Sequence, residues 1–138
     1  MTGFLLDTNV LSELRRKQPN AALVSWWRAV PEQSLRISVL TLGEIRYGVE
    51  KLALRDSASA AVYERWMAQL ITHFGDRLLS VDHTVAQAWG QLRASRPIPV
   101  VDSLLAATAL AHDLTLVTRN TRDFADLGIS LFNPFDAG

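Results

Sequence analysis

Apolar residues along this chain occur in short runs that alternate with longer stretches of helical spacing. Five runs have the length and composition of buried strands: FLL from Phe4, LRIS from Leu35, LLSV from Leu78, LTLV from Leu114 and ISLF from Ile129. Between them lie two helical stripes, one formed by Leu42, Ile45, Val49 and Leu52 and the other by Val62, Trp66, Leu70 and Phe74. Both stripes are expected to face the core.

Two further helices are predicted in the second half of the chain. One should start at Asp82 and end before the dipeptide Arg96-Pro97, because a proline disfavours helix in the residue before it. The other covers residues 101–112, which are nearly all apolar and therefore predict a central, buried helix. Strands that alternate with helices need crossover connections. The pattern thus predicts an α/β fold with a mainly parallel sheet covered by helices on both sides.

The composition predicts one domain and narrows the chemistry. With 138 residues, 49% apolar residues and no internal repeat or linker, the chain suits a single domain over residues 1–138. The sequence shows no signal-peptide pattern and no apolar run of the roughly 18 residues that a membrane helix needs, so we expect a soluble, cytoplasmic protein without a membrane partner. The lack of cysteine excludes disulfides, thiolate nucleophiles and zinc-thiolate sites, and the three histidines show no ligand spacing. Any bound metal should therefore have oxygen ligands.

Asp7 is the first candidate for a functional residue. It directly follows the apolar run FLL, so the chain carries its carboxylate to the edge of the core, where a charge is costly unless it is paired, hydrogen-bonded or bound to a metal. In open parallel sheets, ligands bind outside the carboxyl ends of the strands. Asp7 is expected at such an end.

Three other acids occur in comparable settings, and each of the four also has a structural explanation. Asp7 would cap a helix that begins at Thr8, and Asp102 would cap the apolar helix that follows it. Asp123 stands three residues after Asn120, as in a capping box. Glu44 would be a solvated glutamate on its helix. Each acid alone is therefore weak evidence for a site.

The combination is stronger, because three of the acids follow or flank predicted strand ends and the fourth, Glu44, lies on a helix that begins just after the second strand, so all four should converge. Their mutual repulsion makes a divalent cation the natural counter-charge, and Mg²⁺ or Mn²⁺ suits oxygen ligands best. Hydroxyls and amides that could orient the carboxylates stand nearby in the sequence, at Thr8, Asn9, Ser38, Thr118 and Asn120. A metal held in this way can activate water and neutralise the charge that develops on a phosphodiester, so the pattern suggests phosphodiester hydrolysis.

Four motifs, LLDTNVLSEL, LGEIRYGVEKL, PIPVVDSLLAATALAH and LTLVTRNTRDF, together resemble the PIN-domain ribonucleases, specifically the VapC toxins of type II toxin-antitoxin systems and their FitB-like branch. The match runs from Asp7 to the NPF at residues 133–135. It implies a three-layer PIN domain that cleaves RNA with Mg²⁺ or Mn²⁺. By this resemblance the catalytic acids are Asp7, Glu44, Asp102 and Asp123. Its metal ligands are Asp7, Asp102 and Asp123, with support from Thr8, Asn9, Thr118 and Asn120. Asp113 departs from the pattern, since similar sequences often have glycine there, which bears on how the preceding helix ends.

The resemblance also implies partners. It suggests an RNA substrate, a homodimer, and inhibition by a cognate antitoxin. The protein would contact DNA only indirectly, through that antitoxin. Five basic residues are expected near the rim of the site, where they would contact phosphates: Arg15, Arg16, Lys17, Arg119 and Arg122. The run from Arg15 to Lys17 also has a structural explanation, because positive charge stabilises the carboxyl end of a helix. The four tryptophans are expected in the core or an interface. The resemblance also implies a groove that binds the antitoxin. Because they are close to the motifs, the residues expected to line this groove are Leu11, Leu14, Trp26, Trp27 and Leu40.

Two alternative functions remain open at this point. A phosphatase with an aspartyl nucleophile would use the DTN sequence as an Asp-x-Asp loop, but that chemistry needs a carboxylate where Asn9 stands. A catalytically silent PIN-like binding module would serve only as a scaffold for RNA or antitoxin, which the intact set of four acids argues against. Metal-dependent nuclease activity distinguishes all three functions.

Overall fold

The computed structural model describes residues 3–136. Its five strands are β1 (Phe4–Leu6), β2 (Leu35–Ser38), β3 (Leu78–Leu79), β4 (Thr115–Val117) and β5 (Leu131–Phe132). They form one sheet in the order β3-β2-β1-β4-β5, and every neighbouring pair is parallel. Each strand lies within one of the five apolar runs, so the predicted strands and the parallel sheet are confirmed.

The helices of the described chain are α1 (Thr8–Leu14), α2 (Ala21–Ala29), α3 (Val39–Ala53), α4 (Ser57–Phe74), α5 (His83–Ser95) and α6 (Val100–Ala111). Three short 3-10 turns, η1 (Glu32–Ser34), η2 (Gly75–Arg77) and η3 (Thr121–Phe124), complete the order. Across the residues that the structure describes, every helix is too short or too polar to cross a membrane.

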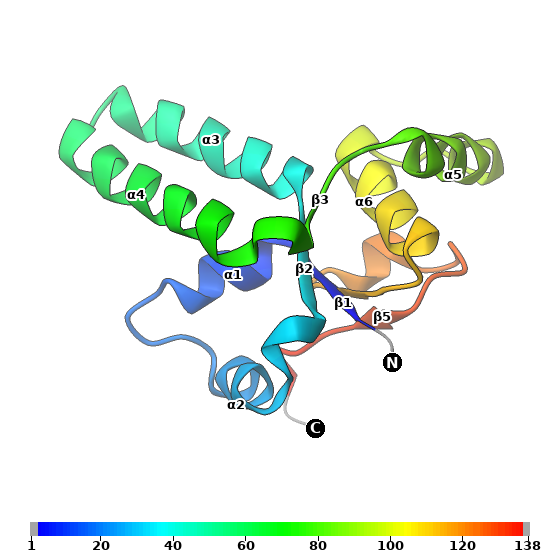
Figure 1. The fold of residues 1–138 in the computed structure, drawn as a ribbon, viewed down its shortest axis with the longest axis horizontal. Helices are drawn as coiled ribbons and strands as arrows, with labels where there is room; N and C mark the ends of the chain where they lie inside the picture. The colour runs from blue at the N-terminus through cyan, green and yellow to red at the C-terminus, as the bar shows by residue number, and fades with distance from the viewer. Residues whose placement is uncertain (1–2, 137–138) are drawn as a thin grey trace.

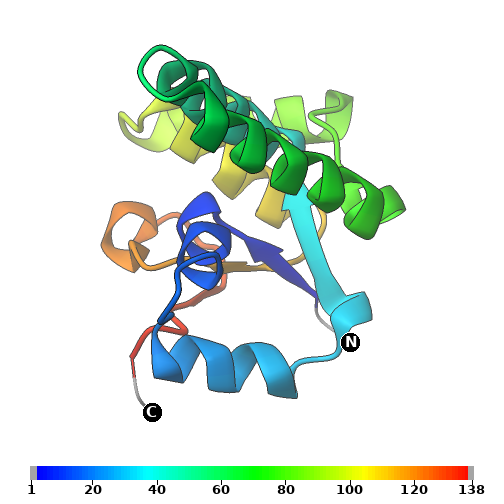
Figure 2. The same ribbon diagram turned by 90° about the vertical axis from the view of Figure 1, so that its left-hand side faces the viewer.

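Helices cover both faces of the sheet, which confirms the three-layer α/β/α fold (Figure 1). Adjacent residues of β1 point to opposite faces: Leu6 packs into a core with α1, α2, α3 and α4, whereas Leu5 packs into a second core with α5, α6 and η3. On the first face, α2 lies at one end, the paired helices α3 and α4 lie at the other, and α1 lies between them (Figure 2). Both faces of β1 are therefore buried, as an uninterrupted apolar strand requires.

The helical stripes are mostly confirmed. Ile45 and Val49 of α3 and Leu70 and Phe74 of α4 are buried. The expectation that Val62 lies in the core is wrong, because its side chain is 51% exposed near the start of α4.

The ends of the helices follow local capping signals. Helix α5 starts where it was expected, because Asp82 caps it by accepting a hydrogen bond from the Val85 N–H at 3.0 Å. The periodicity gave no separate indication of α2, which Asn20 caps by accepting a hydrogen bond from the Leu23 N–H at 2.9 Å.

The end of α6 explains the departure at Asp113. The N–H of Leu114 donates to the carbonyl of Ala109 and the N–H of Asp113 donates to that of Leu110, which together form a Schellman motif. That motif requires a left-handed residue, and Asp113 indeed has a φ of +52°. An aspartate tolerates this conformation better than most side chains, but glycine adopts it without strain.

Replacing Asp113 with Gly should therefore stabilise the protein, by about 0.5 to 1 kcal/mol. Asp113→Ala keeps a side chain on the left-handed backbone without the polar group that tolerates it, so it should be less stable than the wild type. Urea unfolding at an unchanged m-value measures both changes. Equal stability of the Gly and Ala variants would contradict the left-handed assignment.

Candidate active site at the switch point of the sheet

The candidate site lies at the carboxyl ends of β1 and β4. The chain leaves β1 to form β2 and β3 on one side, whereas β4 and β5 lie on the other, so the strand order reverses between β1 and β4. Such a switch point leaves a crevice where ligands bind in open parallel sheets. Asp7 follows β1 and Thr118 follows β4, and the Asp7 N–H donates to the Val117 carbonyl at 2.9 Å.

Asp7 is held by donors from both segments. Its carboxylate accepts hydrogen bonds from the Thr8 N–H at 2.7 Å and from the Thr118 hydroxyl at 2.8 Å. Burial raises the pKa of Asp7, these two bonds lower it, and the charges of Glu44 and Asp123 raise it again, so that the pKa lies above its ordinary value. Asp7 is also the N-cap of α1. Its capping role is therefore confirmed, and that role leaves its second carboxylate oxygen bonded to the segment after β4.

Thr118 is the centre of the hydrogen-bond network around Asp7. Its hydroxyl is completely buried, donates to Asp7, and accepts from the Asn9 amide at 3.3 Å and the Asn120 N–H at 3.1 Å. The Asn9 amide also lies 3.4 Å from the Asp7 carboxylate, and its oxygen accepts the Arg119 N–H at 3.2 Å. The expected polar neighbours thus fix the start of α1 against the segment after β4.

Glu44 lies on the exposed surface of α3, yet it is connected to this network. Its carboxylate accepts a hydrogen bond from the Thr8 hydroxyl at 2.6 Å, and the N–H of the same threonine donates to Asp7. Glu44 is therefore solvated and, at the same time, linked to Asp7 through Thr8. Ser38, in contrast, caps α3 by accepting from the Leu40 N–H at 3.0 Å.

Asp102 and Asp123 do not have the capping roles that their sequence context suggested. Helix α6 begins at Val100 after Pro99, so Asp102 lies inside its first turn instead of at the cap. Asn120 precedes η3 without a side-chain capping bond, so the capping box with Asp123 is not formed. Burial raises the pKa of Asp102, and the charges of Asp7 and Asp123 raise it further.

The acids are thus close enough to act on one another electrostatically. Asp102 and Asp123 also line one cleft of about 430 Å³, together with Arg96, Arg122 and Asp126. Their oxygen donors suit a hard divalent cation. As the side chains of residues 3–136 stand, however, no three acids or histidines are arranged closely enough to hold a metal ion.

Most basic residues expected at the rim have partners inside the protein. The Arg15 guanidinium stacks over the rings of Tyr63 and Trp66, at 4.4 and 4.8 Å from their centroids. Arg119 lies 3.3 Å from the Glu13 carboxylate and stacks over Phe135. Arg122 lines the acidic cleft itself.

Glu13 was missed by the sequence reasoning. Its side chain is almost fully buried and accepts hydrogen bonds from the Asn20 N–H at 2.9 Å and from the guanidinium groups of Arg16 and Arg119. Burial raises its pKa, but these bonds and charges lower it more, so the pKa lies below its ordinary value. One signal was present in the sequence: Glu13 is four residues after Asn9 and so shares its helical face.

Known proteins resemble this chain over most of its length. A family model described as PIN domain matches residues 4–129. Toxin FitB from Neisseria gonorrhoeae is 35% identical over 136 residues, which cover 95% of this chain and 97% of that protein. The VapC ribonuclease Y4jK from Sinorhizobium fredii is 29% identical, with 96% of this chain and 97% of that protein covered.

Solved structures agree with these relatives. The crystal structure of FitAcB from Neisseria gonorrhoeae contains a chain with a TM-score of 0.86 and 34% identity, covering 97% of this chain and 99% of that chain. The DNA-bound VapBC from Salmonella typhimurium gives a TM-score of 0.72 at 28% identity, covering 97% and 99%. The chain belongs to the PIN-domain family, and its resemblance to the VapC and FitB-like branch is confirmed.

The raised pKa of Asp7 predicts how stability depends on pH without metal. A raised folded-state pKa favours the neutral acid, so the contribution of Asp7 to stability is fully present below its ordinary pKa of 3.8 and is lost as the pH rises through the raised pKa. Asp7→Asn removes this loss, and in EDTA at pH 7 it should be more stable than the wild type by on the order of 1 kcal/mol. The difference should shrink as the pH approaches 4, as thermal melts at several pH values would show.

Asp82→Asn is the matched control for that comparison. Asp82 also caps a helix, but the hydrogen bond from Val85 lowers its pKa, so its loss should not stabilise the protein at pH 7. An Asp7→Asn variant that melts below the wild type in EDTA, as loss of a cap would cause, contradicts the prediction.

Proposed function

We propose that this PIN-domain protein is a metal-dependent endoribonuclease and the toxin of a toxin-antitoxin pair, inhibited by its cognate antitoxin. The observation that carries the proposal is the partly buried Asp7 at the switch point, held by Thr118 and acted on electrostatically by Glu44 and Asp123. The names of the relatives, which include a VapC ribonuclease and a toxin, support the same activity.

In this proposal Asp7, Asp102 and Asp123 hold Mg²⁺ or Mn²⁺ and Glu44 completes the catalytic acids. The bound metal supplies activation of water and neutralisation of charge on the phosphodiester. Burial and neighbouring negative charges oppose the ionisation of the Asp7 and Asp102 carboxylates. A bound cation would offset both the cost of burying the charge and the repulsion between the charges. Thr118 and Asn9 orient the Asp7 carboxylate.

RNA contacts are proposed for the basic residues at the rim, Arg15, Arg16, Arg119 and Arg122. Arg122 has the best supported role, because it lines the same cleft as Asp102 and Asp123. A guanidinium there can contact a phosphate while the acids act on its neighbour. Arg119 is tied to Glu13, so we expect it to contribute less.

The geometry disfavours the phosphatase alternative. Asn9, which would occupy the position of the second carboxylate, uses its amide to connect Asp7, Thr118 and the Arg119 N–H. The silent binding module is the remaining alternative, and catalysis is the property that separates it from a nuclease.

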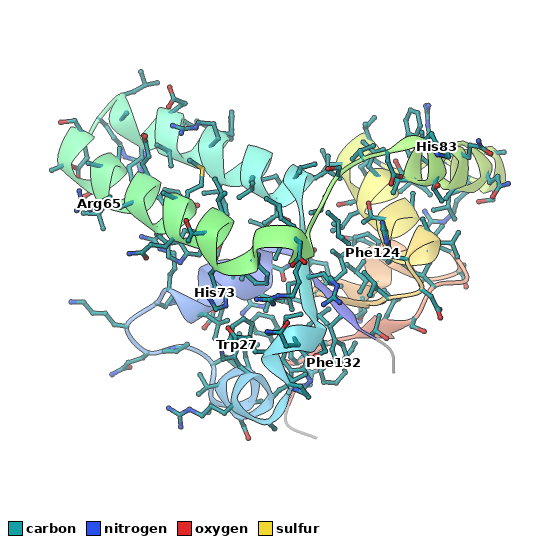
Figure 3. All side chains as sticks on the ribbon, in the orientation of Figure 1. Trp27, Arg65, His73, His83, Phe124 and Phe132 are labelled. Atoms are coloured by element: carbon teal, nitrogen blue, oxygen red, sulfur yellow. The ribbon has the colours of Figure 1, made fainter. Side chains whose placement is uncertain are left out.

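A groove on the α1–α4 face supports binding of an antitoxin segment. It has a volume of about 610 Å³ and is lined by Leu11, Leu14, Arg15, Trp27, Val62, Arg65, Trp66, Gln69, Leu70, His73 and Phe74. Trp27 lies on α2, and Arg65 and His73 lie on α4 (Figure 3). Of the five residues expected there, Leu11, Leu14 and Trp27 line the groove; Trp26 instead lines a separate cavity with Phe132, and Leu40 is not part of the lining.

We propose that an apolar helix of the antitoxin occupies this groove and that its chain continues toward the acids. Helix α1 connects the two places, because Asp7 caps its start and Leu11 and Leu14 line the groove. We further propose a cytoplasmic homodimer that contacts DNA only through the antitoxin. Toxin-antitoxin complexes, some of them DNA-bound, are among the structural relatives.

The activity is tested with purified protein freed of antitoxin and a single-stranded RNA. Cleavage should require Mg²⁺ or Mn²⁺, and Asp102→Asn should reduce it by at least roughly 100-fold while leaving the fold intact by circular dichroism. Undiminished cleavage in excess EDTA would refute the metal requirement. A folded, pure protein that cuts no RNA in either metal would favour the silent binding module.

The groove is tested with Val62→Glu and the co-expressed protein encoded beside this one. Val62 lines the groove and is half exposed, so a carboxylate there should weaken complex formation by roughly 10-fold or more without disturbing the core. RNA cleavage by the free variant should be unchanged. Leu54→Glu is the control, because Leu54 is 87% exposed and lies outside the groove lining. Equal affinities of both variants, measured by calorimetry, would place the partner elsewhere.

A further inference from the structure

Arg96 connects the two chain segments that carry Asp102 and Asp123. It is the residue at which α5 ends, and its side chain is partly buried. One guanidinium nitrogen donates to the carbonyl oxygens of Asp123 at 3.3 Å and Ala125 at 3.0 Å, and the other donates to the carbonyl of Pro97 at 3.3 Å. Arg96 therefore bonds to the backbone at the residue that presents the carboxylate of Asp123 and again just after η3.

The connection from Arg96 to Asp102 is short and stiff. It runs through Pro97, Ile98 and Pro99, and the two proline rings fix their own φ angles. Helix α6 begins immediately afterwards, with Asp102 in its first turn. A side chain anchored at the start of this connection thus relates the position of Asp102 to the turn that holds Asp123.

Apolar packing holds the two segments together but does not determine their orientation. Phe124 of η3 is buried in the same core as Leu105 of α6 and Leu92 of α5 (Figure 3 labels Phe124). Such contact is not directional. Hydrogen bonds are directional, so the two bonds from Arg96 restrict the rotation of the backbone at Asp123.

We propose that Arg96 is a positioning residue that orients Asp123 relative to Asp102 for binding of the catalytic metal. This inference rests on the proposed function. In this role Arg96 acts through Asp123, whose backbone carbonyl accepts its hydrogen bond. The planar guanidinium suits this role because it can donate to several acceptors in fixed directions, which a lysine ammonium cannot reproduce.

The experiment measures Mn²⁺ binding to the antitoxin-free protein by calorimetry, alongside RNA cleavage. Arg96→Met should lower Mn²⁺ affinity by roughly 10-fold, as loss of a group that orients a metal ligand does. Arg96→Lys keeps the charge but not the geometry, so it should recover only part of the affinity. The matched control is Arg36→Met, since Arg36 also donates to two carbonyls, those of Gln33 and Leu35, at the amino end of β2. Its Mn²⁺ affinity should stay within about twofold of the wild type.

A double variant shows whether Arg96 acts through Asp123. In the Asp123→Asn background, Arg96→Met should change Mn²⁺ affinity by less than about twofold, because the ligand that it orients is already altered. A roughly 10-fold loss that persists in this background would overturn the proposal. Unchanged or higher affinity in Arg96→Met itself would also overturn it.

Two further outcomes are distinguishable. If the wild type binds no Mn²⁺ and cuts no RNA, the proposed function fails and this inference fails with it. If the wild type does both while Arg96→Met and Arg36→Met behave alike, only the inference fails. Melting in EDTA shows whether each variant folds. If Arg96→Met does not fold, the Mn²⁺ affinity of Arg96→Lys is compared with that of the wild type instead, and a lower affinity supports the proposal.

Discussion

The carboxylate of Asp7, at the end of a strand buried on both faces, is the constraint on which the rest of the site depends. Leu5 and Leu6 commit β1 to two different cores, so the next residue reaches the crevice still largely shielded from water. Burial makes its charge unfavourable, and the Thr8 N–H and the Thr118 hydroxyl offset part of that cost. Because these donors come from α1 and from the segment after β4, stabilising the charge also fixes those two segments to each other.

The remaining acids come from separate elements, which makes the site sensitive to how those elements are held. Glu44 on α3 accepts a hydrogen bond from the Thr8 hydroxyl, whereas Asp102 and Asp123 lie on α6 and η3 on the other side of the sheet. Apolar cores set the spacing of these elements, but hydrogen bonds such as those of Thr118 and Arg96 set their orientation. Like charges oppose the final approach of the carboxylates, which a divalent cation would favour.

Several arginine side chains of this protein bind acceptors or aromatic rings within the protein itself. Of the 14 basic residues, only Lys17 and Lys51 are lysines, and arginine favours planar, bidentate contacts to carboxylate or phosphate. The structure shows carbonyl acceptors for Arg77 and Arg96, aromatic rings for Arg15, and the buried Glu13 for Arg119. The rim is therefore less basic than the sequence suggested, and Arg122 is the residue in that group that lines the acidic cleft.

The sequence by itself determined the five strands, the helices with apolar stripes, the helix that starts at Asp82 and the unusual helix end at Asp113. Each depends on neighbours within a turn or a strand, so periodicity and local hydrogen bonding suffice. It also indicated the four acids, because strand ends of a parallel sheet share one edge. Only the tertiary structure decided that Val62 borders a groove, that Asp102 is not a cap, and that Glu13 and Arg96 hold distant segments. The partners of Glu13 and Arg96 lie 106 and 27 residues away, at Arg119 and Asp123. Packing of the sheet and helices brings such pairs together, and no pattern within a short stretch of sequence predicts which distant residues will meet.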